Sequence, residues 1–225
     1  NDTNGIYRAF PGTMTLTEYT AFYLDPFLVY FTPGGAKHNI RGRWYRTDNN
    51  NNNGQENSAN VFLGNYEFGK SFNKIGGLTV TGGLYINETY SEANLYAGSG
   101  SPKNDLKNRS AYLQLGQKFF KTLHVMAGVR GEYFELNGGE EVFKPVFRTG
   151  ANFEITKTTN IRASYGQGYR YPTIAEKFII TTTGGIYVFP NPEVKPESSW
   201  SMEAGIKQGF KIGGFMGYLD FALFR

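Results

Sequence analysis

Few residues of this sequence could do covalent or metal chemistry. The 225 residues include no cysteine and only two histidines, His38 and His124. The lack of thiols excludes disulfide scaffolds, zinc-thiolate sites and thiol catalysis. Both histidines fall near the start of alternating segments and away from the longer connections, so neither is placed to anchor a nucleophile and its base. The adjacent Glu140 and Glu141 are too little for a Ca²⁺ site. We therefore expect no enzyme, no metal and no cofactor.

A second group of residues has a more distinctive spacing. The run Gly168-Tyr-Arg-Tyr-Pro172 precedes Glu176, and Asn191-Pro-Glu-Val-Lys-Pro-Glu197 follows. Pro172 restricts the residue before it to extended geometry, and the later prolines deny their segment regular pairing. The charged side chains here can form charge-assisted contacts that either fix the shape of a loop or bind a ligand directly. The candidates for these roles are Arg170, Tyr171, Glu176, Lys195 and Glu197.

The elements that must position these residues are strands, because apolar and polar residues alternate with a period of two. Leu78–Ile86 is the clearest case, with leucine, valine and isoleucine on one face and threonine and tyrosine on the other. Pro26 falls inside the first strand and either bends it or divides it, because proline cannot donate to a ladder. Residues 1–16 are expected to be loop. The pattern predicts ten antiparallel strands at residues 17–32, 37–47, 59–73, 78–90, 109–120, 123–136, 143–156, 160–168, 198–211 and 215–225.

The connections between these strands alternate in length. Short ones fall at 33–36, 74–77, 121–122, 157–159 and 212–214, and longer ones at 48–58, 91–108, 137–142 and 169–197. Outer-membrane barrels combine short turns at one end with long loops at the other. A soluble sandwich has no reason for such alternation, because its loops serve both ends alike.

The polar faces of the strands carry charge, which suits a wet lumen better than a packed core. The apolar faces would then contact lipid, and a soluble antiparallel β-protein with an aromatic core is the alternative. The expected lumen-facing residues are Arg41, Arg43, Arg130, Arg148, Arg162 and Glu203. Their positive charge would attract an anionic ligand or an acidic inner surface, or it would be matched by nearby glutamates such as Glu132, Glu154 and Glu203.

The composition agrees with a strand-built membrane protein. There are 29 glycines and 35 phenylalanine and tyrosine residues, and the mean hydropathy is only −0.43. No apolar run approaches the ~20 residues of a membrane helix, but alternating strands look polar on average. The net charge of +4 comes without the basic clustering of a nucleic-acid footprint, so no nucleic-acid partner is expected.

The length indicates part of a larger barrel. Ten strands use about 22 residues each, and a plugged 22-stranded transporter would need roughly 480 residues of barrel at that rate. The sequence also stops inside an alternating segment, Phe215–Arg225. We therefore expect residues 1–225 to form an all-β, antiparallel transmembrane barrel region of about ten strands, belonging to a 22-stranded barrel whose plug domain is not in this chain.

Residues 161–176 and 189–203 together resemble the barrel of TonB-dependent outer-membrane receptors. That family shows a Gly-(Phe/Tyr)-Arg-x-Pro turn with a Glu a few residues on, and then Asn-Pro-x-Leu-Lys-Pro-Glu before a strand with an inward Glu. Here Gly168–Pro172, Glu176, Asn191–Glu197 and Glu203 match, with Val194 in place of the usual Leu. The resemblance implies an outer-membrane location in a Gram-negative bacterium. The partners that it implies are the membrane lipid, a plug domain, the TonB system through that plug, and a small-molecule or metal-chelate ligand.

The charges divide unevenly along the predicted elements. The four longer connections hold nine acidic and five basic side chains, a net of −4, which leaves +8 on the rest.

By the resemblance, the chain is part of a receptor for TonB-energised uptake of a scarce ligand such as a ferric siderophore, haem or cobalamin. The alternatives are a passive porin-like channel and a soluble β-rich adhesin or binding module.

Overall fold

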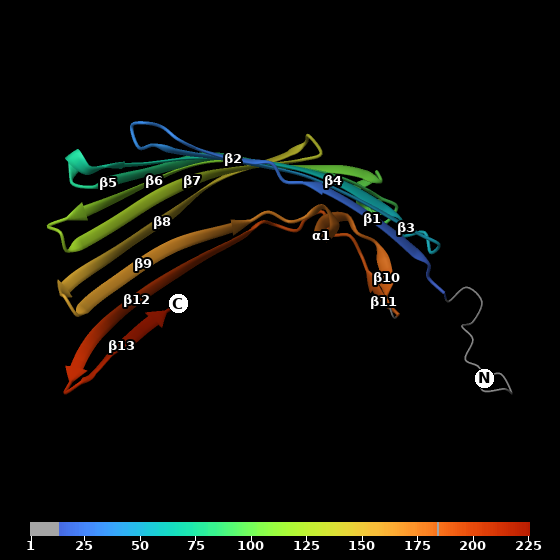
Figure 1. Cartoon of the computed structure of the whole chain (residues 1–225). Helices are drawn as coiled ribbons and strands as arrows, with labels where there is room; N and C mark the ends of the chain where they lie inside the picture. The colour runs from blue at the N-terminus through green and yellow to red at the C-terminus, as the bar shows by residue number, and fades with distance from the viewer. Residues whose placement is uncertain (1–13, 184) are drawn as a thin grey trace.

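The computed structural model describes residues 14–183 and 185–225, and it consists of one large curved antiparallel sheet with a small hairpin beneath it (Figure 1). Its strands are β1 (Thr17–Leu24), β2 (Phe27–Phe31), β3 (Lys37–Asn51), β4 (Asn57–Phe72), β5 (Leu78–Ala93), β6 (Lys103–Phe119), β7 (Leu123–Leu136), β8 (Glu140–Thr156), β9 (Thr159–Arg170), β12 (Glu197–Ile212) and β13 (Phe215–Phe224). The helices are short: η1 (Asn73–Ile75), η2 (Ala97–Ser99) and α1 (Ile174–Phe178). The hairpin pairs β10 (Thr181–Thr183) with β11 (Ile186–Val188).

Sequential neighbours pair throughout the large sheet, in the order β1-β3-β4-β5-β6-β7-β8-β9-β12-β13, with β2 also on β3. The sheet bends into an open trough, and α1, β10 and β11 lie on its concave side (Figure 1). Within the described residues, β1 and β2 form one edge and β13 the other, and these edges are not paired. The prediction of an all-β antiparallel barrel region is confirmed, and the sheet is a partial barrel.

Pro26 divides the first predicted strand in two. β1 ends at Leu24 opposite Trp44 and β2 begins at Phe27 opposite Arg41, so the register continues across the break. The Gly42 N–H donates to the Pro26 carbonyl at 2.9 Å. A Cβ on Gly42 would lie 3.2 Å from the proline ring, so glycine gives the ring the room that it needs.

The strands extend further than predicted at one end of the sheet. At this end, called the loop end, the connections are 52–56, 94–102, 137–139 and 171–196. The predicted strict alternation of connection length is wrong here, because 137–139 is as tight as the turns at the opposite end. It turns through Asn137 and Gly138, both with positive φ. Nine of the fourteen charges expected in loops therefore lie on strands: Asp48, Glu92, Lys103, Asp105, Lys107, Glu140, Glu141, Arg170 and Glu197.

The two faces of the sheet differ in polarity. Cross-strand partners share a face, which places Phe68, Gly82, Leu113, Val129 and Phe147 in one row. Leu113 and Phe147 are 47 % and 50 % exposed, as are many apolar residues of this convex face. Such a wide apolar surface is typical of contact with a membrane or a partner. No helix of the described residues is long and apolar enough to cross a membrane.

One seam in the sheet is open. The β8–β9 ladder ends at Arg148 opposite Gly166, although β8 pairs with β7 from Phe153 to Glu140. The Phe147 N–H donates to the Gln167 side chain at 3.2 Å, so odd-numbered residues of β8 direct their N–H groups toward β9. Pro145 is also an odd-numbered residue of β8, but it has no N–H to direct toward β9. It therefore removes a bond to β9 and leaves the β7 ladder intact.

Candidate functional site at the loop end

The motif residues lie where β9 leaves the sheet and the chain turns onto its concave side. Arg170 is the last residue of β9 and pairs with Glu197, the first residue of β12. Tyr171 and Pro172 follow in the bend, and both are buried. Because Pro172 disfavours helical geometry at the residue before it, the chain stays extended through Tyr171, and α1 begins only at Ile174.

A capping box starts α1. The Glu176 N–H donates to Thr173 Oγ1 at 3.3 Å, and the Thr173 N–H donates to Glu176 Oε2 at 2.8 Å. This reciprocal pairing satisfies two backbone donors that a helix start leaves unpaired. Thr173 was not singled out from the sequence, although the Thr-x-x-Glu spacing is the signature of this cap.

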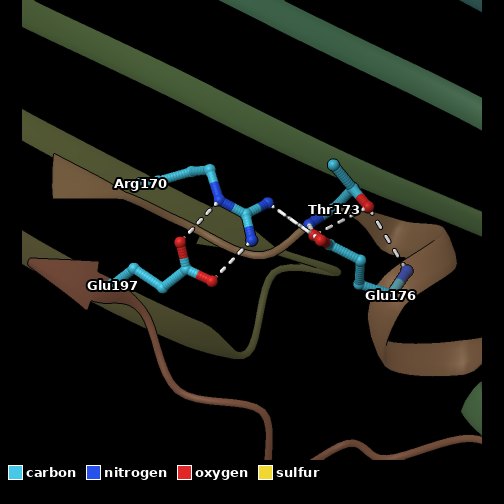
Figure 2. Close-up of polar contacts among 4 residues, drawn as sticks. All are labelled: Arg170, Thr173, Glu176 and Glu197. Atoms are coloured by element: carbon cyan, nitrogen blue, oxygen red, sulfur yellow. Dashed lines mark hydrogen bonds and ion pairs between the residues drawn. The ribbon is translucent and has the colours of Figure 1, made fainter.

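Arg170 joins the two acidic residues of the motif (Figure 2). Its Nε and Nη2 donate to the two carboxylate oxygens of Glu197 at 3.1 and 2.8 Å. Its Nη1 donates to both oxygens of Glu176 at 2.9 and 2.8 Å. The guanidinium therefore ties the base of β12 to the first turn of α1. All three side chains are partly exposed, between 41 % and 68 %, so water screens the attraction.

The same contacts keep Glu176 ionised. The Arg170 guanidinium, followed by the backbone N–H of Thr173, lowers the pKa of Glu176 to about 2. The carboxylate therefore holds its full negative charge at neutral pH, and the Arg170 charge is matched by two carboxylates. The sequence left two roles open for these side chains, fixing the shape of the loop or binding a ligand. This arrangement favours the first, because the donor groups of Arg170 are already engaged within the chain.

A small apolar core anchors this segment to the sheet. Tyr171, Ile174 and Phe178 pack with Leu136 of β7, and Phe134, Leu106, Val142, Tyr96 and Tyr169 surround them. The rings of Tyr171 and Phe134 stack with centroids 5.1 Å apart and planes 13° apart. Together these residues form a hydrophobic cluster of buried residues in the described chain. The loop itself therefore supplies much of the apolar surface that is buried on the concave side.

A buried lysine completes the anchor. Lys177 is only 2 % exposed, and its Nζ donates to Glu140 at 2.6 Å. The same Nζ lies 5.5 Å from the centre of the Tyr171 ring. Burial raises the pKa of Tyr171 above its usual value, and the Glu140 carboxylate raises it further. Lys177 and Glu140 were not predicted as site residues, because only the fold brings them together.

Neighbouring loops cover this segment. The Ile180 N–H donates to the Leu95 carbonyl at 2.8 Å, and the Gln55 amide reaches Thr181 Oγ1 at 3.4 Å. A Cβ on Gly98 would lie 2.2 Å from Pro190, so only glycine fits there. Three connections at the loop end therefore touch one another around α1. Lys195 does not join them: it is exposed, and no ion pair or hydrogen bond of its side chain is found within residues 14–183 and 185–225.

The predicted lumen-facing residues lie on the concave face, the face that α1 covers, and most are matched by acidic neighbours. Arg43 binds Asp25 through two contacts of 2.7 Å. Arg162 binds Glu203 and Asp220, both at 2.8 Å. Arg130 lies against Glu132. It also stacks over two tyrosines, Tyr85 at 5.2 Å and Tyr112 at 6.0 Å.

Two concave arginines differ from these three. Neither Arg41 nor Arg148 has a carboxylate within 4.0 Å among the described residues. The sequence left two interpretations of these positive charges: pairing with nearby acids, or unmatched charge that attracts an anion. Pairing describes Arg43, Arg130 and Arg162, and unmatched charge describes Arg41 and Arg148. In the same part of the chain, no group of three or more His, Asp and Glu side chains is arranged to hold a metal ion.

The curved antiparallel sheet, its apolar convex face and its charged concave face are the features of part of a membrane β-barrel. The family model for the β-barrel of TonB-dependent receptor-like proteins matches residues 3–225, and the chain belongs to that family. The family consists of transporters of the Gram-negative outer membrane and not of enzymes. The comparison with curated proteins found no match.

Two solved structures share the fold. The siderophore receptor PirA from Pseudomonas aeruginosa aligns with a TM-score of 0.75 and 14 % identity, over 92 % of this chain and 39 % of that one. A double mutant of the Serratia marcescens hemophore receptor HasR, in complex with its hemophore HasA and heme, aligns with a TM-score of 0.71 and 12 % identity, over 95 % of this chain and 40 % of that one. The chain thus spans about two fifths of the length of these receptors.

Proposed function

We propose that this chain forms part of an outer-membrane receptor that takes up a scarce ligand with energy delivered through TonB. The ligand class is a ferric siderophore, haem or cobalamin. The observation that carries the proposal is the anchored segment at the loop end, where Arg170 and the Tyr171 cluster fold α1 onto the concave face. A receptor for a specific ligand needs groups held in a defined place by packing and hydrogen bonds, and this segment is held in that way.

Family membership and the two receptor folds support the same class. PirA is a siderophore receptor, and HasR was solved with a heme-bearing hemophore. Family membership decides against a soluble adhesin, and the passive channel stays as the alternative for the test. The remaining proposals follow from the class: a barrel of 22 strands, a plug domain within it, and TonB as the partner that acts on the plug.

The test is uptake by the full-length receptor. It would be produced in a Gram-negative host that lacks its own iron and cobalamin receptors, with and without TonB. Radiolabelled ferric siderophores, haem and cobalamin would be supplied at nanomolar concentration. We expect accumulation of one of these ligands only in the strain with TonB. Uptake that is equal in both strains and does not saturate would establish the passive channel and overturn the proposal.

A further inference from the structure

Arg148 occupies an unusual place at the middle of the concave face. Its cross-strand partners are glycine on both sides, Gly128 on β7 and Gly166 on β9. Cross-strand partners are the nearest side chains on one face of a sheet. Since both are glycine, neither cross-strand partner has a side chain to cover Arg148, which is exposed.

Two hollows in the wall meet at this residue. One has a volume of about 300 Å³ and is lined by Arg148 with Tyr112, Gln114 and Arg130 among others. The second has a volume of about 530 Å³ and is lined by Arg148 with Ser164, Ser199 and Ser201 among others. No aspartate or glutamate lines either hollow. Hydroxyl, amide and guanidinium groups therefore line the hollows. Two of them are already matched by acids outside the lining, Arg130 by Glu132 and the Tyr112 hydroxyl by Glu67, whereas Arg148 is not.

The other arginines of this face show that the chain matches such charges where it can. Arg43, Arg130 and Arg162 each lie within 4.0 Å of a carboxylate. Arg41 has none among the described residues, but Asp25 lines the hollow that it shares. Arg148 is therefore the concave arginine that, among the described residues, has no carboxylate within 4.0 Å and no acid in the lining of its hollows. An unmatched guanidinium in a donor-lined hollow is a place for an external anion.

We propose that the hollows around Arg148 bind a carboxylate group. The planar fork of a guanidinium matches the two oxygens of a carboxylate. Sites for phosphate usually add several free backbone N–H groups, whereas here Arg148 is paired in the ladders with Gly128 and Gly166, and the Phe147 N–H at the open seam donates to the Gln167 side chain. The carboxylate comes either from a part of the receptor that lies inside the lumen or from a solute that passes through it. The inference rests on the proposed function in taking the concave face as a lumen.

The experiment uses the full-length receptor in detergent and three variants, Arg148→Gln, Arg148→Lys and Lys144→Gln. Lys144 is the matched control, because it lies on the same strand, four residues away and with the same facing. Thermal unfolding and citrate binding by calorimetry would be measured for each. A carboxylate within the receptor predicts that Arg148→Gln lowers Tm by about 2 °C or more, that Arg148→Lys recovers at least half, and that the control is unchanged.

A solute carboxylate predicts a different result. Citrate would bind the wild type and the control, Arg148→Gln would weaken that binding at least tenfold, and Tm without citrate would not change. The proposal is overturned if Arg148→Gln changes neither Tm nor citrate binding, or if Arg148→Lys loses as much Tm as Arg148→Gln, which would indicate packing alone. None of these readouts depends on uptake, so failure of the proposed function would be seen separately in the transport assay.

Discussion

Arg170 and Glu197 close the base of the longest loop with two nearly parallel bonds of 3.1 and 2.8 Å between a guanidinium and a carboxylate. The two residues are cross-strand partners at the last pair of β9 and β12. The ladder thus ends in a side-chain fork, and the same guanidinium continues to Glu176 in α1. This geometry leads to a first prediction about the rigidity of the loop.

Replacing Arg170 with lysine should loosen α1 without unfolding the sheet. Lysine keeps the charge but cannot form two forks at once. Since the three side chains are partly exposed, water screens part of this loss, and the cost should stay within the small range of surface pairs. Hydrogen exchange of the Ile179 and Ile180 amides should become about fivefold faster. Exchange in β5, far from the fork, is the control. An unchanged rate at Ile179 and Ile180 would show that the apolar cluster alone holds the segment.

The anchor of α1 should weaken in acid. The pKa of Glu176 is lowered to about 2 by Arg170 and Thr173, whereas an unfolded glutamate titrates near 4.3. A group with a depressed folded pKa contributes stability above its unfolded pKa and loses it as the pH falls toward the folded value. Exchange at Ile179, corrected for the intrinsic pH dependence, should therefore be steady above about pH 5 and rise between about pH 4.5 and 2.

The matched variant for this titration is Glu176→Gln. Glutamine retains hydrogen-bonding groups but has no charge to lose, so its exchange should start faster and show a smaller rise across the same pH window. If wild type and Glu176→Gln gave parallel curves, another acidic group would be responsible. Glu197 is the first to examine, because Arg170 also lowers its pKa and a Glu197→Gln variant separates the two.

Much of this architecture could be predicted from the sequence, because a period of two is visible in single residues. The strand at 123–136 has the predicted bounds. At the loop end the predicted strands are too short, because β3 and β6 continue through polar stretches such as Asp48–Asn51 and Lys103–Asn108. Alternation of apolar and polar residues is lost once both faces are wet, although the ladder continues.

The candidate site was only partly predictable. Arg170, Glu176 and Glu197 are close in the motif and are brought together in the structure. The Lys177–Glu140 pair joins residues far apart in the sequence, so no local pattern could indicate it. The role of Pro145 was also missed, because its effect depends on which neighbouring strand its missing N–H would have faced.

Pro145 leads to the third prediction. If its missing N–H opens the seam, Pro145→Val should extend the β8–β9 ladder toward Tyr169. A single added hydrogen bond is worth about 1 kcal/mol, so the Tyr169 amide should exchange about fivefold more slowly. The Ala151 amide, within the part of β8 that already pairs with β9, should not change. Unaltered exchange at Tyr169 would mean that strand twist and not the proline separates the strands.

The assignment of the two faces gives the last prediction. Leu84 is 58 % exposed on the convex face, whereas Thr81 pairs with Gly69 and Gln114 in the concave row that leads to Arg148. An arginine at mid-membrane on the lipid face of a barrel costs about 2–4 kcal/mol. Leu84→Arg should lower the free energy of unfolding from lipid vesicles by about that amount, measured by urea titration. Thr81→Arg meets water and neighbouring polar groups, so its effect should be below about 1 kcal/mol. Equal losses in the two variants would contradict the assignment of the convex face to lipid and the concave face to the lumen, and with it the placement of Arg148 inside the barrel.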